Sequence, residues 1–417
     1  MPLQGNWNYP TAIRFGAGRL KELPEACKAA GMAKPLLVTD PGLSKLPMVA
    51  EAVAFAKKAG LGVAVFDGVK SNPVAKNVED GLAVLRGGKH DGVIAFGGGS
   101  ALDTGKVIAF MAGQTRPMWD FEDIGDWWTR ADEKGIAPVV AVPTTAGTGS
   151  ETGRAGVITD ETTHTKKIIF HPKMMPRIVI ADPELTLGLP PKVTAATGMD
   201  AFAHCLEAYC APSFHPYAEG IALEGMRLVK EFLPRAVADG KDIAARAHML
   251  AASQMGSTAF QKGLGAIHSL SHPVGAVLDT HHGLTNAVVM PYVLKFNEAA
   301  IAEKLARVSR YLGLAKPGFA GFLDWVLDLR KQIGIPHTLA ELGMKPGQLA
   351  EFSKMASEDP TAGGNPVKAG VPEMRAMYDA ALAGRLCGRP APGAIWPRAA
   401  GPRPSSLRCD TSARACR

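Results

Sequence analysis

The sequence predicts an α/β domain with a Rossmann-like parallel sheet, followed by an all-helical domain. Over residues 1–190, short apolar segments rich in β-branched residues alternate with helical stretches, which is typical of a parallel sheet covered by helices. After the proline pair at 190–191, alanine- and leucine-rich stretches with helical periodicity replace them. The length of 417 residues also exceeds what one hydrophobic core usually serves, so two domains are expected.

The individual elements follow from the same patterns. Strands are predicted at residues 35–39, 62–66, 92–96, 138–142 and 177–181. Helices are predicted at 51–60, at 75–86 and directly after the glycines that begin at residue 97. In the second domain, helices are predicted at 193–209, 216–238, 242–262, 283–297, 299–312, 319–334 and 371–386. The domain boundary is therefore placed between residues 190 and 191, where the proline pair suits a helix start.

The C-terminal residues 387–417 differ from both domains. They hold five prolines, six arginines and one aspartate, without apolar periodicity. We expect this tail to be disordered, and a basic interaction arm is the alternative. The tail carries +5 of the net charge of +7, which leaves +2 for the rest of the chain. A nearly neutral body has no basic stripe, so no nucleic-acid partner is expected.

Composition also bears on location. No segment approaches the roughly 18 apolar residues of a membrane span, so no membrane partner is expected. The first residues, Met1–Pro10, lack the basic start and apolar run of a secretory signal. The six cysteines are scattered without disulfide-type or metal-type spacing. We therefore expect reduced thiols and a cytoplasmic protein.

A run of three glycines and a serine at 97–100 lies between a predicted strand and a predicted helix. Glycine lets backbone N–H groups approach a phosphate closely, and a helix N-terminus adds partial positive charge. Ser100 can cap the helix, and Asp103 lies in its first turn. The alternative is a tight turn, but three glycines exceed what a turn needs. The run therefore predicts a phosphate cradle, although it is not the GxGxxG fingerprint.

Two further loops follow predicted strands, at the sheet edge where open α/β folds bind ligands. Asp40 follows the first predicted strand and can hydrogen-bond a ribose 2′-hydroxyl and repel a 2′-phosphate. It can equally be an ordinary turn residue before Pro-Gly. Residues 143–151 are small or polar and include Thr144, Thr145 and Thr148. They favour a polar loop that approaches a ligand closely.

Asp200 and His204 are four residues apart in a predicted helix, so their side chains share one face. The neighbouring residues are apolar, which predicts that this face is buried. A buried carboxylate and imidazole need partners, and a shared cation would serve both. For this pair alone, a simple Asp–His hydrogen bond is the better interpretation.

The segment at 263–287 changes that interpretation. It contains four of the eleven histidines among glycines and small apolar residues: His268, His272, His281 and His282. One carboxylate with two or three imidazoles suits Fe²⁺ or Zn²⁺ with an open coordination position. The two segments together therefore predict a catalytic metal between packed helices.

Taken together, these motifs resemble the iron-containing, or group III, alcohol dehydrogenase family. The matching segments are GGGSALD (97–103), PTTAGTGSE (143–151), GVITD (156–160), TAATGMDAFAHCLEAY (194–209), IHSLSHPVGA (267–276) and HHGLTNAVVMPYV (281–293). They lie in order at family spacing and span nearly all of residues 10–386. The resemblance implies a dehydroquinate synthase-like architecture, with a dinucleotide-binding domain at 1–190 and a metal-binding domain at 191–386.

The resemblance also implies roles for individual residues in the helical domain. The implied metal ligands are Asp200, His204, His268 and His282. His272 is linked with substrate handling and proton transfer, and His281 is structural.

In the α/β domain, the resemblance implies contacts with NAD. Gly98, Gly99 and Ser100 form the pyrophosphate cradle, with Asp103 in its supporting turn. Thr144, Thr145 and Thr148 lie near the ribose and nicotinamide. Asp40 favours NAD over NADP, Asn72 contacts the adenosine side, and Lys166, with Lys167 beside it, contacts the cofactor. Ala155 departs from the asparagine that some members carry near the nicotinamide.

The implied activity is hydride transfer between NAD(H) and a primary alcohol, small diol or hydroxy acid, with iron or zinc, in a homodimer or larger homo-oligomer. One alternative is an NAD- and metal-dependent lyase or synthase similar to dehydroquinate synthase, which would need a basic substrate pocket. Another is a non-catalytic protein that binds nucleotide or metal. Seven apolar residues are candidates for the pocket lining or for the core: Trp119, Phe121, Ile124, Trp127, Trp128, Phe260 and Leu264.

Overall fold

The computed structural model describes residues 11–163 and 165–386. Its α/β part is built on a parallel sheet with the strand order β1-β8-β5-β4-β2-β3. The strands are β1 (Ala12–Phe15), β2 (Pro35–Val38), β3 (Ala64–Phe66), β4 (Gly92–Gly97), β5 (Val139–Pro143) and β8 (Ile178–Ala181). The five predicted strands are confirmed, and β1 was not predicted. The predictions for Met1–Pro10 and for the 387–417 tail lie outside the described residues.

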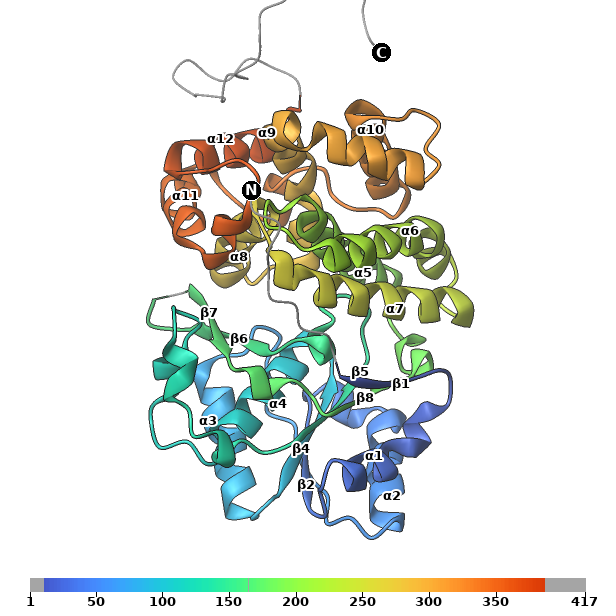
Figure 1. Cartoon of the computed structure of the whole chain (residues 1–417), viewed down its shortest axis with the longest axis vertical. Helices are drawn as coiled ribbons and strands as arrows, with labels where there is room; N and C mark the ends of the chain where they lie inside the picture. Colours follow the sequence, from blue (N-terminus) through green and yellow to red (C-terminus); the bar gives the residue numbers. More distant parts are fainter. Residues whose placement is uncertain (1–10, 164, 387–417) are drawn as a thin grey trace, which may run out of the picture.

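Helices cover both faces of this sheet (Figure 1). They are α1 (Leu23–Ala29), α2 (Pro47–Lys58), α3 (Ala75–Gly87) and α4 (Gly99–Met111). Successive residues of a strand point to opposite faces. In β2, Leu37 therefore packs into the core with α1 and α2, whereas Leu36 and Val38 pack into the core with α3 and α4. Burial on both faces explains why these strands are continuous apolar runs.

An antiparallel hairpin, β6 (Ala155–Asp160) with β7 (Thr165–Phe170), lies outside the main sheet. This hairpin was not predicted from the sequence. Gly156 lets the hairpin lie against α4, because a Cβ there would be 2.5 Å from Val107 Cγ2. Neighbouring residues of β7 point in opposite directions, which separates two lysines. Lys166 lines a large cleft, whereas Lys167 forms ion pairs with Glu122 and Asp160.

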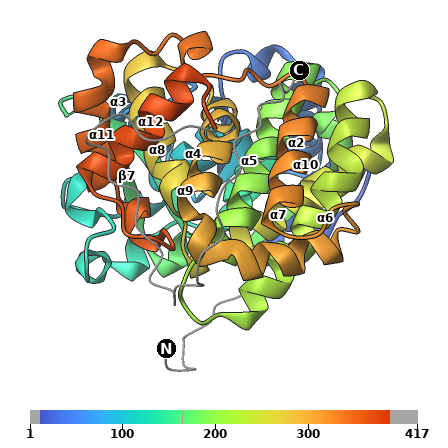
Figure 2. The same cartoon turned by 90° about the horizontal axis from the view of Figure 1, so that it is seen from above.

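The second part of the chain is helical. Its helices are α5 (Pro191–Cys210), α6 (Pro216–Ala238), α7 (Ile243–Ala259), α8 (Ala266–Leu278), α9 (His282–Tyr311), α10 (Phe319–Gln332), α11 (Leu349–Glu358) and α12 (Val371–Ala383). Seen from above, α5 and α9 run through the middle of this layer, with α6 and α7 on one side and α11 and α12 on the other (Figure 2).

The prediction of separate helices at 283–297 and 299–312 was wrong, because α9 is continuous. No residue at the expected break ends a helix. Asn297 is buried and exchanges hydrogen bonds with Asn365. Glu298 forms an ion pair with Lys295 one turn earlier. In the described part of the chain, none of these helices is long and apolar enough to cross a membrane.

Candidate metal centre and cofactor cleft

A large cleft is lined by residues from both parts of the chain, where loops after β2, β4 and β5 face α5, α7, α8 and α9. All fourteen predicted cofactor-binding and metal-binding residues line it, and so does His272. The structure therefore brings together residues that are more than 240 positions apart, from Asp40 to His282. Ligand sites at the carboxyl ends of parallel strands are typical of open α/β sheets.

Three helices bring the predicted metal ligands together. Asp200 and His204 lie one turn apart on α5, His268 lies in the first turn of α8, and His282 is the first residue of α9. The Nε2 atoms of His204 and His268 are each 4.0 Å from Asp200 Oδ1, and Nε2 of His282 is 3.6 Å away. The atoms of Asp200, His204 and His268 lie close enough together to hold one ion.

Glycines allow this close approach. A Cβ on Gly283 would lie 2.3 Å from the Ala196 carbonyl oxygen, so only glycine lets the start of α9 pack onto α5. A Cβ on Gly256 would lie 3.0 Å from His204 Cβ, so α7 also comes close to this group. Gly283 directly follows the candidate ligand His282 on α9, and Gly256 lies on α7, beside His204.

The chemistry of the four side chains fits a divalent cation. Burial lowers the pKa of His204 to about 4. Burial also lowers the pKa of His282 well below its ordinary value, and the nearby Lys166 adds to this effect. Both imidazoles are therefore neutral near pH 7, which is the form that binds metals. A buried carboxylate among neutral imidazoles is stabilised by a bound cation.

Asn286, one turn after His282 on α9, was not predicted as part of this group. Its Nδ2 donates to Asp200 Oδ1 at 2.8 Å and lies 3.2 Å from Nε2 of both His268 and His282. The carboxylate and both imidazoles thus face the same amide group. One carboxylate oxygen and two Nε2 atoms therefore lie around the same point, as a metal site requires.

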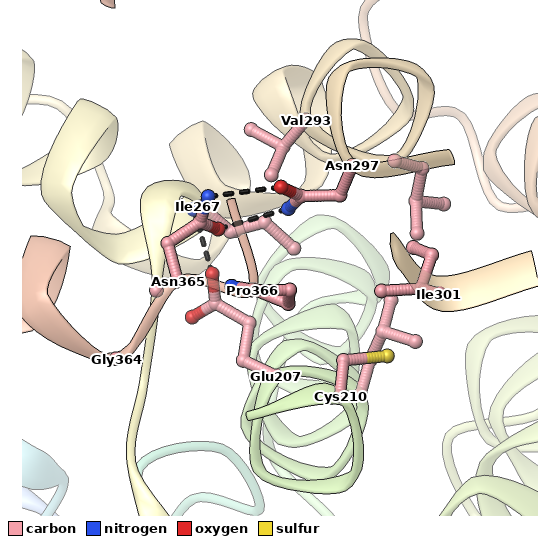
Figure 3. A pocket seen from close by; sticks show the side chains of 12 residues that line it. Glu207, Cys210, Ile267, Val293, Asn297, Ile301, Gly364, Asn365 and Pro366 are labelled. Carbon is pink, nitrogen blue, oxygen red and sulfur yellow. Dashed lines mark hydrogen bonds between the residues drawn. The ribbon is translucent and has the colours of Figure 1, made fainter. Parts of the chain in front are cut away.

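Glu207 was also missed. It lies on α5, three residues after His204, and its Oε2 is 2.5 Å from His268 Nδ1. Its Oε1 accepts the backbone N–H of Ile267 at 2.7 Å. Figure 3 shows the Glu207 side chain pointing toward the start of α8, beside the paired amides of Asn297 and Asn365. The carboxylate therefore fixes the orientation of the His268 ring and leaves Nε2 facing Asp200.

Burial alone would lower the pKa of His268, but the Glu207 carboxylate outweighs it and raises the pKa above the ordinary value. With Nδ1 donating to Glu207, the remaining ring nitrogen is the one available to a cation. A glutamate one turn along the same helix face was the signal that could have found this contact.

His272 of α8 has a similar partner. Its Nδ1 is 2.7 Å from Oδ2 of Asp359, which is nearly buried. Thr361 holds this carboxylate in place through its backbone N–H, at 2.9 Å, and its hydroxyl, at 2.5 Å. His281, predicted to be structural, is exposed at the N-cap of α9. Asp359 lies 87 residues from His272, so no local pattern could have revealed the pair.

The glycine run forms the turn from β4 into α4. Gly97 has a φ of 147°, Gly98 is the N-cap, and no side chain caps the helix. A Cβ on Gly99 would lie 2.5 Å from Thr148 Cγ2, and one on Gly98 would lie 3.3 Å from Thr145 Cγ2. Backbone N–H groups at the start of α4 are thus left free of side-chain caps beside the threonine loop, as an anion site needs.

The expectation that Ser100 caps this helix was wrong. The helix begins at Gly99, which places Ser100 inside the first turn, and its hydroxyl donates to the carbonyl oxygen of Ser71. Asp103 lies in the second turn of the helix, not in the first as predicted. It accepts the Ser150 hydroxyl and the Val157 backbone N–H, the latter at 3.0 Å. Asp103 therefore ties both the threonine loop and the hairpin to α4.

The remaining predicted cofactor residues lie around the same cleft. Asp40 Oδ1 accepts the backbone N–H groups of Gly42 and Leu43, each at 2.9 Å, so the turn role is present. Asn72 donates to Asp279 Oδ1 at 2.5 Å across the cleft. Burial lowers the pKa of Lys166, while the charges of acidic neighbours, Asp200 foremost, oppose this shift.

Of the seven apolar candidates for the pocket, Phe260 and Leu264 belong to the cleft lining. The Phe260 ring lies 5.2 Å from the His204 ring. Phe121 is instead a core residue that packs edge-on against Phe110. Trp128 lies behind the wall, 6.5 Å from the ring of the lining residue Phe170. The three other candidates are not in the lining: Trp119, Ile124 and Trp127.

Comparison with known proteins shows which protein family the chain belongs to. Residues 10–183 match the model of iron-containing alcohol dehydrogenase, and residues 194–382 match that of the C-terminal region of the Fe-containing alcohol dehydrogenase family. The chain is also 39% identical over 384 residues to a 4-hydroxybutyrate dehydrogenase of Cupriavidus necator, which covers 90% of this chain and 99% of that protein. The chain belongs to the iron-containing alcohol dehydrogenase family.

Two further relatives agree. The NAD-dependent methanol dehydrogenase of Bacillus methanolicus is 37% identical over 384 residues, covering 90% of this chain and all of that one. The crystal structure of a 1,3-propanediol oxidoreductase superposes with a TM-score of 0.86 at 35% identity, covering 91% of this chain and 100% of the other. The predicted fold class is thereby confirmed. This iron-containing alcohol dehydrogenase is an oxidoreductase that interconverts an alcohol and an aldehyde with NAD(H). That assignment favours the dehydrogenase over both alternatives.

Proposed function

We propose that the chain oxidises a primary alcohol, small diol or hydroxy acid at a divalent metal held by Asp200, His204, His268 and His282, with NAD bound along the opposite wall of the cleft. The observation that carries this proposal is the convergence of one carboxylate and three imidazoles on the cleft that the glycine turn also lines. The names of the relatives, which act on short alcohols or a hydroxy acid, support the substrate range.

Bound in this group, Fe²⁺ or Zn²⁺ would lower the pKa of an alcohol hydroxyl by polarising its oxygen. The protein's part is positional. Glu207 orients His268, and the imidazoles of three histidines surround the Asp200 carboxylate. A nicotinamide supplies the hydride acceptor, and the threonines at 144, 145 and 148 are placed to orient it.

Proton removal falls to His272 in this proposal. Asp359 accepts from its Nδ1, so the other ring nitrogen is free to take a proton from the cleft. Asp359 thus selects the tautomer of the His272 ring. The role is a positioning one, since Asp359 acts through His272.

We propose NAD rather than NADP as the cofactor because Asp40 lines the cleft after β2. A carboxylate there can accept from a ribose 2′-hydroxyl and repels a 2′-phosphate. Asp40 Oδ1 accepts the two turn N–H groups, so Oδ2 is the oxygen that would accept from the ribose hydroxyl. The homo-oligomeric state, the cytoplasmic location and the choice between iron and zinc stay predictions.

The test is a screen of NAD reduction across short primary alcohols, diols and hydroxy acids, with Fe²⁺ or Zn²⁺ added back to chelated protein. We expect NADH to accumulate in proportion to substrate consumed. A lyase or synthase would use NAD transiently and leave no net NADH. Substrate consumption without NADH would therefore overturn the proposal.

A further inference from the structure

Arg154 lies in the wall of the cleft, where the threonine loop leads into β6. Its side chain is half-buried, and its guanidinium carbon lies 5.5 Å from the centre of the Phe170 ring. Within residues 11–163 and 165–386, no hydrogen bond or ion pair holds this guanidinium. Burial lowers the pKa of Arg154, and the Asp123 carboxylate opposes this from beyond ion-pair distance.

A half-buried guanidinium that no hydrogen bond or ion pair holds is costly, because the contact with the Phe170 ring replaces only part of the hydration that it gives up. Charged groups in such positions are normally paired with an opposite charge. The arginine fork has five N–H donors in a plane, which matches the two oxygens of a carboxylate. The cleft therefore offers an anion site at Arg154 that no described side chain fills.

Two indirect contacts relate the segment that carries Arg154 to the metal group. The Phe260 ring lies 5.2 Å from the His204 ring. One turn earlier on α7, Ser257 approaches the residue before Arg154: a Cβ on Gly153 would lie 3.7 Å from Ser257 Oγ. The lining on this side also includes the apolar side chains of Phe170 and Met175.

Arg154 is separate from the proposed pyrophosphate cradle. The cradle lies at the start of α4, at Gly98 and Gly99. The hairpin that follows Arg154 crosses α4 further along, where a Cβ on Gly156 would meet Asp103 and Val107. Arg154 therefore belongs to a different segment of the cleft wall from the glycine turn that forms the cradle.

We propose that Arg154 binds the carboxylate of the substrate, which makes the substrate class a short ω-hydroxy acid and its semialdehyde. This inference rests on the proposed function. The carbinol carbon loses a hydride to NAD⁺ and its hydroxyl loses a proton, which gives the aldehyde, NADH and H⁺. The carboxylate takes no part in bond changes. It selects and aligns the substrate, with the apolar wall around its methylene groups.

The experiment compares 4-hydroxybutanoate with 1,4-butanediol, which has the same chain length without the charge. Metal-loaded wild type, Arg154→Lys and Arg154→Met are measured with NAD, and Arg130→Met serves as a control because Arg130 is exposed and lies over Trp127 outside the lining. We expect wild type to favour the hydroxy acid. Arg154→Met should lower kcat/KM for it by about 100-fold, mainly through KM, because charge-assisted hydrogen bonds are lost. Arg154→Lys should recover part of this loss.

For 1,4-butanediol, Arg154→Met should stay within about threefold of wild type, and KM for NAD should not change. Equal losses on both substrates, or a raised KM for NAD with every alcohol, would assign Arg154 to folding or to the cofactor and overturn the inference. Equal use of both substrates by wild type would overturn it as well, while leaving the proposed function intact. If none of the tested alcohols yields NADH, the proposed function itself is overturned.

Discussion

Glu207→Gln tests whether the carboxylate behind His268 sets the strength of metal binding. In the wild type, the two Glu207 oxygens accept separately from Ile267 N–H and from His268 Nδ1. Glutamine has one acceptor oxygen and an amide that only donates. One of the two bonds is therefore lost, and the remaining one is no longer charge-assisted.

The size of the effect follows from the burial of this contact. Glu207 is 6% exposed and His268 is 1% exposed, so water does not replace the lost acceptor. A hydrogen bond to a charged group is worth about 1.5–3 kcal/mol. With about 1.4 kcal/mol for each tenfold change, metal affinity should fall about 10- to 100-fold.

The assay is competition for Zn²⁺ between the chelated protein and a chromophoric chelator, with NADH binding followed by fluorescence. NADH binding should survive, because Glu207 is not among the residues that line the cleft beside the glycine turn. Glu224→Gln, at a partly exposed position of α6 beside Arg227, is the matched control. A Zn²⁺ affinity within twofold of wild type in a folded Glu207→Gln protein would refute the reasoning.

Two more substitutions address the proton route and the cofactor. Asp359→Asn removes the anionic acceptor of His272 Nδ1, so kcat should fall about tenfold while KM for NAD stays constant; steady-state kinetics that show an unchanged kcat would exclude this positioning role. Asp40→Gly should raise kcat/KM with NADP relative to NAD, because repulsion of a 2′-phosphate is removed. An unchanged cofactor ratio, in a variant whose thermal unfolding shows an intact fold, would contradict the discrimination assigned to Asp40.

The regular parts of the fold could be predicted from the sequence because burial leaves a local pattern. The buried strands β2, β4, β5 and β8 are continuous apolar runs, and the helices after residue 190 keep apolar residues on one face. The hairpin of β6 and β7 could not be found in this way. Its strands are only partly buried and carry lysines and threonines, so they lack both the apolar run and a clean alternation.

The candidate site was predictable where spacing places residues on one helix or motif. Asp200 and His204 share a helix face, and the glycine turn follows a strand. Partners from distant segments gave no such signal. Asp359 meets His272 only through the packing of α8 against the loop after α11.

The central claim, that four side chains hold the metal on which turnover depends, is tested most directly by His268→Ala together with chelation. Turnover and bound metal are measured on the same preparations, and NADH binding is followed by fluorescence. We expect chelated wild type and His268→Ala to lose turnover and metal together, NADH binding to persist, and Fe²⁺ or Zn²⁺ to restore the wild type alone. Full turnover in a metal-free preparation would contradict the account.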